Sequence, residues 1–233
     1  MAIIDFLFPK HCPVCLKPLL PDGRLICEDC RARIPYIRSP FCLVCGAPVT
    51  EEEELSCKNC KNGRAFDRGA SWADYTDPAM RQMIARVKFH GEAQLLDFPC
   101  RDFAGRKKEL LLSLRPEALI PVPVSPKRKK ARGYNQAEEI AVRMAEILRL
   151  PVDTSCLLKH EGSDDQKTLS RIERKENLLK AFTATEAAAR YKSVILVDDI
   201  LTTGSTLDAC ALQLKRAGVK KVLVASLLAV PDR

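Results

Sequence analysis

The chain has 233 residues, of which 46% are hydrophobic and 29% are charged, and its formal net charge is +8. This length suits one ordinary domain with a small appendage, and the hydrophobic content suits a buried core. The longest apolar runs, at 194–197 and 222–230, are far shorter than the roughly 20 residues that span a bilayer. The first residues lack the basic region and the cleavage site of a secretory signal, so we expect a cytoplasmic protein without a transmembrane segment.

Eleven cysteines are unevenly distributed along the chain. Eight of them form four Cys-x-x-Cys pairs that begin every 15 residues, at positions 12, 27, 42 and 57. CPVCLKPL followed by CEDC, and CLVCGAPV followed by CKNC, form two copies of a ~30-residue unit. Paired thiolates suit tetrahedral zinc, whereas redox chemistry usually needs a single pair. We therefore expect two structural zinc ions, held by Cys12, Cys15, Cys27, Cys30, Cys42, Cys45, Cys57 and Cys60.

The spacing of the pairs leaves two ligand groupings open. A sequential grouping, which we favour, joins the first pair with the second and the third with the fourth, whereas a cross-braced grouping joins the first with the third. In either case each four-thiolate site carries a net charge of −2, which reduces the charge of the chain from +8 to about +4. A segment this poor in apolar residues needs the metal to fold. We expect Cys100, Cys156 and Cys210 to be buried core thiols.

A change in composition near residue 62 divides the chain into a zinc-binding module, residues 1–62, and a second domain, residues 63–233. In the second domain, Asp77 and Pro78 predict a helix that runs to Gly91. Another helix is expected over 93–112, followed by a strand over 118–124.

The remaining elements continue this alternation. Apolar residues at helical spacing predict a helix over 136–150, and the polar stretch 160–169 predicts a mobile loop. Ser170 and Glu173 form a capping box that would start the next helix. A strand over 193–198, a helix over 205–217 and a strand over 221–229 complete the chain. Such alternation predicts an α/β fold with right-handed βαβ units and a mostly parallel sheet.

The sequence VILVDDILTTGSTL, residues 194–207, combines a buried strand, two acids and a loop rich in hydroxyl groups. Ligands of open α/β sheets bind at the carboxyl ends of the strands, where this loop would lie. Backbone N–H groups, hydroxyls and the positive end of the next helix suit a phosphate monoester, and Gly204 allows close approach. Asp198 and Asp199 are placed to hold a sugar diol or a ligand that carries Mg²⁺.

This segment resembles the phosphoribosyl pyrophosphate-binding motif of type I phosphoribosyltransferases. The resemblance implies that Asp198 and Asp199 contact the ribose hydroxyls and that Mg²⁺ bridges the pyrophosphate and the hydroxyls of the ligand. It also implies that the 5′-phosphate is bound by Thr202, Thr203, Gly204, Ser205 and Thr206. The fold implied is a phosphoribosyltransferase-like parallel sheet with flanking helices, preceded by a small zinc-ribbon or zinc-knuckle module.

Two further segments, PVPVSPKRKKARGYNQA (121–137) and QKTLSRIERKENLLKAF (166–182), resemble the ComF family, named for competence proteins. The resemblance extends over nearly the whole chain, with the motifs in the same order. It implies a role in the uptake or use of single-stranded DNA and, as a partner, a helicase-like ATPase of the DNA-uptake machinery.

Both segments carry basic residues. The first is expected to form a basic loop at the ligand-binding edge of the sheet, where its cations could bind a pyrophosphate or a nucleic-acid backbone, although a solvated surface run is the alternative. Its candidates for nucleic acid are Lys127, Arg128, Lys129 and Lys130. Its candidates for binding the phosphorylated ligand, which match the family segment, are Arg132, Gly133, Asn135 and Gln136. Tyr134 could stack on a base.

The second segment supplies Arg171 and Arg174, which lie three residues apart and could reach one anion together. In related transferases a mobile loop at this position closes over the pyrophosphate. The alternative is that both arginines are surface charges of a helix.

Three functions remain open on the sequence. The first is a ComF-like protein that binds phosphoribosyl pyrophosphate and handles single-stranded DNA, with a possible transfer to an unknown acceptor. The second is a phosphoribosyltransferase of nucleobase salvage, but such an enzyme needs a hood that recognises its base, and we find no base-reading group of residues. The third is a scaffold without catalysis that binds DNA or protein.

Overall fold

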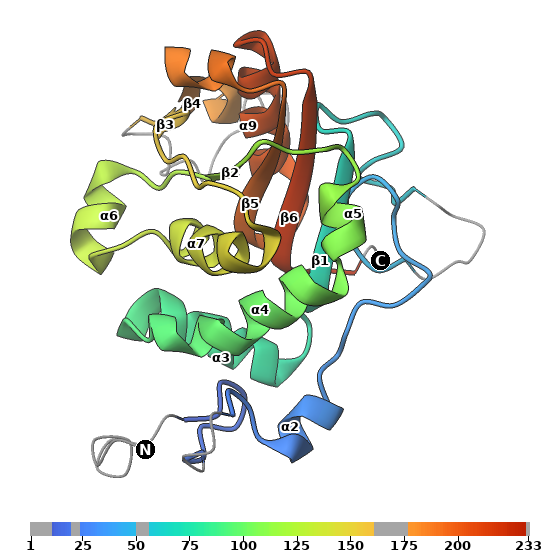
Figure 1. Ribbon diagram of the computed structural model, residues 1–233, viewed down its shortest axis with the longest axis vertical. Coiled ribbons are helices and arrows are strands. Elements are labelled where there is room, and N and C mark those ends of the chain that lie inside the picture. The colour runs from blue at the N-terminus through green and yellow to red at the C-terminus, as the bar shows by residue number, and fades with distance from the viewer. Residues whose placement is uncertain (1–10, 20–23, 50–55, 161–176, 232–233) are drawn as a thin grey trace.

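The structure of the protein is a computed structural model that describes residues 11–19, 24–49, 56–160 and 177–231. Its centre is a four-stranded parallel sheet with the strand order β1-β6-β5-β2 (Figure 1). A separate antiparallel pair, β3 and β4, lies beside it. The strands are β1 (Arg68–Asp74), β2 (Ala118–Pro121), β3 (Leu157–Lys159), β4 (Phe182–Ala184), β5 (Ser193–Leu201) and β6 (Lys221–Ala229). This arrangement confirms the predicted α/β fold with a mostly parallel sheet.

Helices flank the sheet and connect its strands. The α-helices are α2 (Glu28–Ala32), α3 (Pro78–His90), α4 (Asp97–Arg106), α5 (Lys108–Leu112), α6 (Pro126–Arg132), α7 (Gln136–Leu148) and α9 (Ser205–Arg216). Two short 3₁₀ helices are η1 (Ala93–Leu96) and η2 (Glu186–Arg190). Within the described ranges, none of these helices has the length and apolar character needed to span a membrane.

The two faces of the sheet bury two different hydrophobic cores. Side chains alternate along a strand, so Ile195 and Val197 of β5 enter one core while Val194 and Leu196 enter the other. The first core is closed by α3, α4 and α7, together with the first and second cysteine pairs. The second core is closed by α9, together with the third and fourth cysteine pairs. Each half of the cysteine-rich segment therefore belongs to a different side of the sheet.

Local signals determine where several helices begin and end. The Asp77 carboxylate accepts hydrogen bonds from the first N–H groups of α3, and Pro78 occupies its first position. Gly91 ends α3 with a φ of 73°, a conformation that glycine adopts without a steric penalty. The predicted helix over 77–91 is thus confirmed.

The link between the cysteine-rich segment and the sheet runs along the edge of β1. Ile37 N–H donates to the Trp72 carbonyl at 3.0 Å, and Asp74 N–H donates to the Pro35 carbonyl at 2.9 Å. The Arg106 guanidinium stacks on Tyr36, 4.1 Å from the ring centroid. This packing covers part of an edge strand that would otherwise be open to pairing.

Two features of the second domain differ from the expectations. No strand was predicted over 68–74, yet this stretch forms β1 and pairs in parallel with β6. The run 127–132 was predicted as a loop, which is wrong, because it forms α6. Ser125 caps this helix by accepting from Arg128 N–H, and Gly133 ends it. The capping box at Ser170 and Glu173 and the predicted loop over 160–169 lie almost wholly outside the described residues.

Candidate functional site

Each half of the cysteine-rich segment brings four thiols together. Within each group the Sγ atoms lie within 4.8 Å of one another, with Cys15 and Cys27 at 3.8 Å and Cys45 and Cys57 at 3.7 Å. A tetrahedron with Zn–S bonds of ~2.3 Å has sulfurs about 3.8 Å apart, so both groups fit zinc. The grouping is the sequential one: zinc unit 1 consists of Cys12, Cys15, Cys27 and Cys30, and zinc unit 2 consists of Cys42, Cys45, Cys57 and Cys60.

The two zinc units differ in exposure. Cys15 of zinc unit 1 is exposed, whereas all four cysteines of zinc unit 2 are buried. Zinc unit 2 is also closer to the sheet, because Gly46 lies against the backbone of β1. A Cβ atom at Gly46 would lie 2.7 Å from the Ala70 Cα, and one at Gly69 would lie 2.6 Å from the Cys45 backbone. Only glycines at both positions allow this contact.

The acidic pair lies at the carboxyl end of β5. Asp199 N–H donates to Asp198 Oδ1 at 2.8 Å, and Lys88 Nζ lies 2.7 Å from Asp199 Oδ2. Burial, reinforced by the charge of Asp199, raises the pKa of Asp198 to about 7. One carboxyl group can therefore gain or lose a proton near neutral pH while its neighbour is paired with a cation.

Residues 202–206 lead from the end of β5 into the first turn of α9. Thr202, Thr203 and Ser205 are exposed, and the hydroxyls of Thr203 and Ser205 are 2.9 Å apart. Gly204 has a φ of 74° and is the N-cap of α9, a helix of 12 residues. Exposed hydroxyls thus lie at the N-terminus of this helix, a combination that suits a phosphate group. We refer to residues 202–206 as the phosphate loop.

The polar residues at the junction of α6 and α7 form hydrogen bonds within the protein. Asn135 is buried, and its amide donates to the Val122 carbonyl at 3.0 Å while its oxygen caps α7. Gln136 is buried and accepts from Arg132 Nη1 at 3.1 Å. Gly133 ends α6 with a φ of 82°. These contacts place Arg132 at the end of α6, while the predicted roles of all four residues in ligand binding stay predictions.

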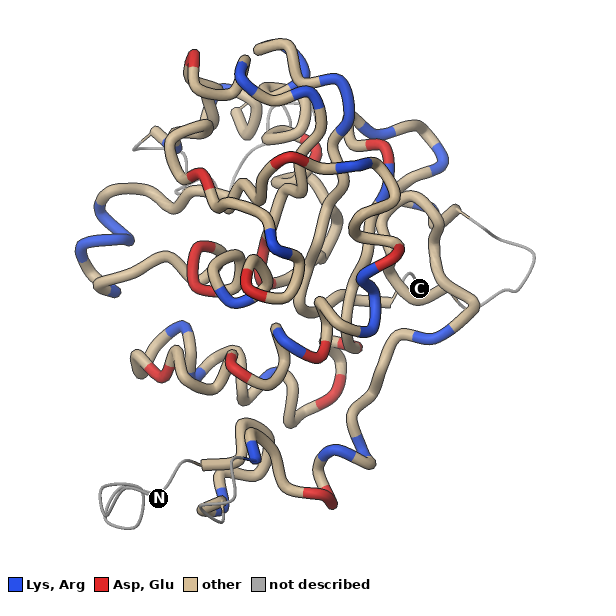
Figure 2. The backbone as a smooth tube through the Cα atoms, viewed as in Figure 1, with Lys and Arg blue, Asp and Glu red and all other residues tan. Residues whose placement is uncertain are grey.

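Helix α6 is a basic projection from the body of the protein (Figure 2). Its cations are largely solvent-facing, and Lys129 pairs with Glu138 at 3.1 Å. Close to its end, the Arg132 guanidinium lies 5.5 Å from the ring centroid of Phe89, which is 71% exposed. Tyr134 is less available for stacking, because it packs against the core and its hydroxyl donates to the carbonyl of Val87. The candidate nucleic-acid residues on this helix are Lys127, Arg128, Lys129 and Lys130.

Two candidate residues cannot be placed in this site. Arg171 and Arg174 lie outside the described residues, so their predicted contact with the pyrophosphate stays a prediction. Asp198, Asp199 and the phosphate loop, by contrast, form one continuous segment at the carboxyl end of β5.

Comparison with known proteins agrees with both halves of this arrangement. Residues 3–61 match a family model described as a double zinc ribbon domain, and residues 134–233 match one described as a phosphoribosyl transferase domain. The chain is 33% identical to competence protein F of Haemophilus influenzae over 173 residues, which cover 70% of this chain and 73% of that protein. The chain belongs to the ComF family.

Other relatives of this ComF-family chain include the DNA utilization protein YhgH of Salmonella typhi. The two are 29% identical over 222 residues, which cover 93% of this chain and 95% of that protein. Among solved structures, a glutamine phosphoribosylpyrophosphate amidotransferase from B. subtilis matches with a TM-score of 0.40 and 18% identity. That match covers 57% of this chain and 26% of the other. It is too distant to carry an argument about activity.

Two residues of this ComF-family chain were missed by the sequence analysis, although both contact the site. Lys88 pairs with Asp199, and Arg64 donates a hydrogen bond to the Thr203 carbonyl at 2.7 Å. Neither belongs to a motif, and both lie between the ranges that the two family models match. Only the packing of α3 and of zinc unit 2 against the ends of β5 and α9 brings these cations to the site.

Proposed function

We propose that this chain binds phosphoribosyl pyrophosphate, together with Mg²⁺, at the carboxyl end of β5 and handles single-stranded DNA with the adjacent basic helix α6. The observation that carries this proposal is the position of Asp198 and Asp199 near the end of β5, two residues before an exposed, hydroxyl-lined segment at the start of α9. Carboxylates suit a ribose diol, and the loop suits its 5′-phosphate, so one continuous segment offers both halves of a phosphorylated sugar.

The acidic pair also suits Mg²⁺, because carboxylate oxygens are preferred ligands of this ion. Asp199, which is paired with Lys88, and Asp198, with its raised pKa, are the residues that would hold the ion together with the oxygens of the ligand. When bound, Mg²⁺ would neutralise charge on the pyrophosphate. The ion pair with Lys88 holds the Asp199 carboxylate in position before any ligand arrives.

Helix α6 supports the part of the proposal that concerns DNA. Its cations would neutralise backbone phosphates, and the exposed ring of Phe89 offers a face on which a base could stack. A helicase-like ATPase, the partner that the family resemblance implies, would deliver the strand to this surface. Two thiolate-rich zinc sites persist in a reducing compartment, which favours a cytoplasmic location.

Measurements of DNA binding by fluorescence anisotropy test this role of α6. The variant Lys127→Gln/Arg128→Gln/Lys130→Gln removes three charges but leaves Lys129, which pairs with Glu138. A matched control, Arg216→Gln/Lys220→Gln/Lys221→Gln, removes three exposed charges at the opposite end of the sheet.

We expect the α6 variant to bind a single-stranded oligonucleotide at least tenfold more weakly in 0.1 M salt. Its log–log salt slope should fall by about 2, because each phosphate contact on a single strand contributes about 0.7. The control should keep the affinity of the wild type. Equal losses in both variants would show that only net charge matters and would overturn the assignment to α6.

A transfer reaction requires a separate assay. Release of pyrophosphate from phosphoribosyl pyrophosphate is measured with a panel of nucleobases and with single-stranded DNA as acceptors. Release with one nucleobase would favour a salvage transferase, whereas release that requires DNA would support a DNA-directed reaction. Binding without release would leave the ligand as a regulator of DNA handling.

A further inference from the structure

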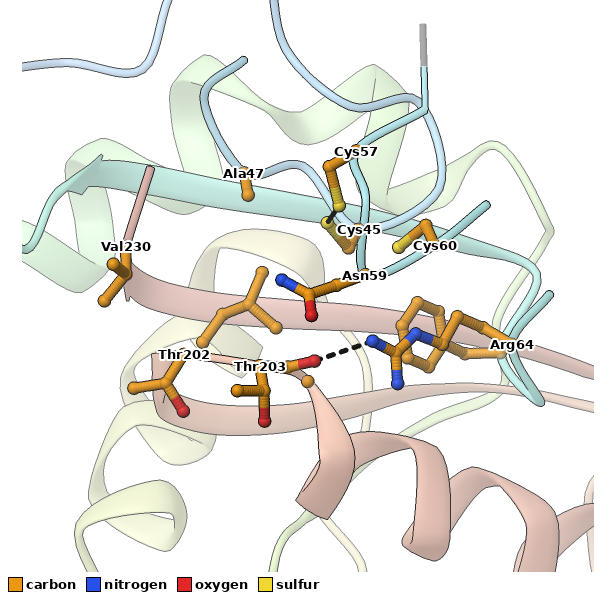
Figure 3. Close-up of a pocket in the computed structure, with 12 residues that line it drawn as sticks. Cys45, Ala47, Cys57, Asn59, Cys60, Arg64, Thr202, Thr203 and Val230 are labelled. Atoms are coloured by element: carbon orange, nitrogen blue, oxygen red, sulfur yellow. Dashed lines mark hydrogen bonds between the residues drawn. The ribbon is translucent and has the colours of Figure 1, made fainter. Parts of the chain in front are cut away.

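The segment that follows zinc unit 2 is hydrogen-bonded to the phosphate loop. Arg64 lies four residues after Cys60, the last ligand of that unit, and its Nη2 donates to the Thr203 carbonyl at 2.7 Å (Figure 3). Its Nη1 lies 3.7 Å from Asp208 Oδ2, in the first turn of α9. Ala65 N–H donates to Asp208 Oδ1 at 2.7 Å. Two consecutive residues thus hold the loop and the helix that it begins.

The ion pair between Arg64 and Asp208 is largely shielded from water. The side chains of Arg64 and Asp208 are only 11% and 20% exposed. Charge-assisted hydrogen bonds are stronger in such surroundings than at an open surface. The Thr203 carbonyl is one of the backbone groups of the phosphate loop, so the position of Arg64 influences the direction in which the neighbouring N–H groups point.

Zinc unit 2 and the phosphate loop also share a pocket. Its lining includes Cys45, Cys57 and Cys60 on one side and Thr202 and Thr203 on the other, with Arg64 beside Thr203 (Figure 3). The position of zinc unit 2 relative to the sheet is constrained, because Gly69 and the Cys45 backbone are in direct contact. Only three residues separate Cys60 from Arg64, so the position of the metal site limits where the guanidinium can lie.

Among the described residues, zinc unit 1 lies on the other side of the sheet from the phosphate loop. Cys12 is buried in the core of α3, α4 and α7, on the other face of the sheet from α9. Zinc unit 2 belongs to the core that includes Leu201 and Leu207, which flank the phosphate loop. The two copies of the repeat, each with one zinc site, therefore differ in their relation to the proposed ligand site.

We propose that Arg64 is a positioning residue that couples zinc unit 2 to the phosphate loop. Zinc bound at unit 2 fixes the chain through Cys60, this chain fixes Arg64, and Arg64 preorganises the loop for a phosphate group. Loss of zinc from unit 2, but not from unit 1, then weakens binding of the phosphorylated ligand. Coupling between two binding sites is reciprocal, so the ligand also retains zinc at unit 2. This inference rests on the proposed binding of phosphoribosyl pyrophosphate.

The test measures zinc release from the full-length, zinc-loaded protein into a colorimetric chelator, with and without phosphoribosyl pyrophosphate and Mg²⁺. Zinc unit 1, with the exposed Cys15, should release its ion in a fast phase, and the buried zinc unit 2 should release its ion in a slow phase. In the wild type we expect saturating ligand to slow the slow phase at least threefold and to leave the fast phase unchanged.

Three variants identify the residue responsible. Arg64→Met should bind the ligand about tenfold more weakly by calorimetry and should lose the effect of ligand on zinc release. Arg64→Lys keeps the charge but not the several N–H donors of the guanidinium. It should recover part of the ligand affinity and part of the effect of ligand on zinc release. Arg106→Met is the control, because Arg106 packs on Tyr36 and pairs with Asp102 away from the loop, and it should retain both properties.

The possible failures are distinguishable. If the wild type binds the ligand and Arg64→Met retains both its affinity and its effect on zinc, the inference about Arg64 is wrong while the proposed function stands. Equal slowing of both phases in the wild type would indicate general stabilisation and would also overturn the inference. If the wild type binds neither phosphoribosyl pyrophosphate nor inorganic phosphate, both proposals are wrong.

Discussion

Replacement of Asp198 with asparagine should make the protein more stable, although it removes a group of the proposed ligand site. Burial and the charge of Asp199 raise the pKa of Asp198 from 3.8 to about 7. The unfolded chain therefore loses this proton more readily than the folded chain. Below pH ~4 the carboxyl is protonated in both states and costs no stability. As pH rises from ~4 to ~7, the unfolded chain ionises first, so the free energy of unfolding falls progressively.

The expected magnitude follows from the size of this shift. A pKa difference of three units corresponds to about 4 kcal/mol at most, at a pH above both values. Asp198 is half-buried, and water at its edge reduces the expected penalty to about 2 kcal/mol at pH 8 and about 1 kcal/mol at pH 5. The asparagine oxygen can still accept the 2.8 Å hydrogen bond from Asp199 N–H, so the variant relieves the penalty without opening a cavity.

Urea unfolding of the wild type and Asp198→Asn at pH 5, 6.5 and 8, in zinc-replete buffer, measures the difference. The variant should be the more stable protein at each pH, and its advantage should grow with pH. An advantage that is constant or shrinks as pH rises would refute the reasoning.

Asp153→Asn should change stability in the opposite direction from Asp198→Asn. Although burial opposes ionisation, hydrogen bonds from Ser155 and Tyr191 lower the pKa of the Asp153 carboxyl. This contribution to stability is present above the ordinary pKa of the carboxyl and is lost as pH falls through its folded pKa. The variant should be less stable than the wild type by about 1–2 kcal/mol at pH 7.

Three further variants test other contacts. Lys88→Met should weaken binding of phosphoribosyl pyrophosphate about tenfold by calorimetry, because the paired acids lose their nearest cation, whereas Arg86→Met on the same helix should not. Phe89→Ala should weaken binding of single-stranded DNA at least fivefold by anisotropy, with little change in the melting temperature. Gly69→Val should lower stability by about 2 kcal/mol or more in thermal unfolding, because its Cβ would meet the Cys45 backbone. Retained values in any of these assays would contradict the corresponding contact.

Much of the sheet could be predicted because its strands are continuous apolar runs. The strand predicted over 221–229 matches β6, and that predicted over 193–198 forms most of β5. The missed strand β1 has the sequence RGASWAD, which is poor in β-branched residues. It forms because it pairs with β6, and Gly69 is there because zinc unit 2 packs against it.

The error at α6 has a different physical origin. Five cations within six residues suggested a solvated loop, but Ser125, Pro126 and Gly133 are the local signals of a short helix with both ends capped. The strength of the charge pattern obscured these signals. The predicted helix over 93–112 is likewise divided into η1, α4 and α5.

The site was predictable only where its residues are neighbours in sequence. The zinc ligands and the segment from Asp198 to Thr206 follow from spacing and residue type. Arg64 and Thr203, in contrast, are separated by 139 residues, and their contact depends on how zinc unit 2 packs against the sheet. The boundary between residues 62 and 63 stays a prediction, and Arg64, two residues after the zinc module, already donates a hydrogen bond to the phosphate loop.

Calorimetric titration of the zinc-replete protein with phosphoribosyl pyrophosphate and Mg²⁺ tests the central claim most directly. The titration is repeated with the double variant Asp198→Asn/Asp199→Asn, which keeps the shape of the site but removes both carboxylates. We predict saturable binding by the wild type, with an affinity at least tenfold lower in the double variant. Absence of binding by the wild type, or equal affinities in the two proteins, would contradict a ligand site at the carboxyl end of β5.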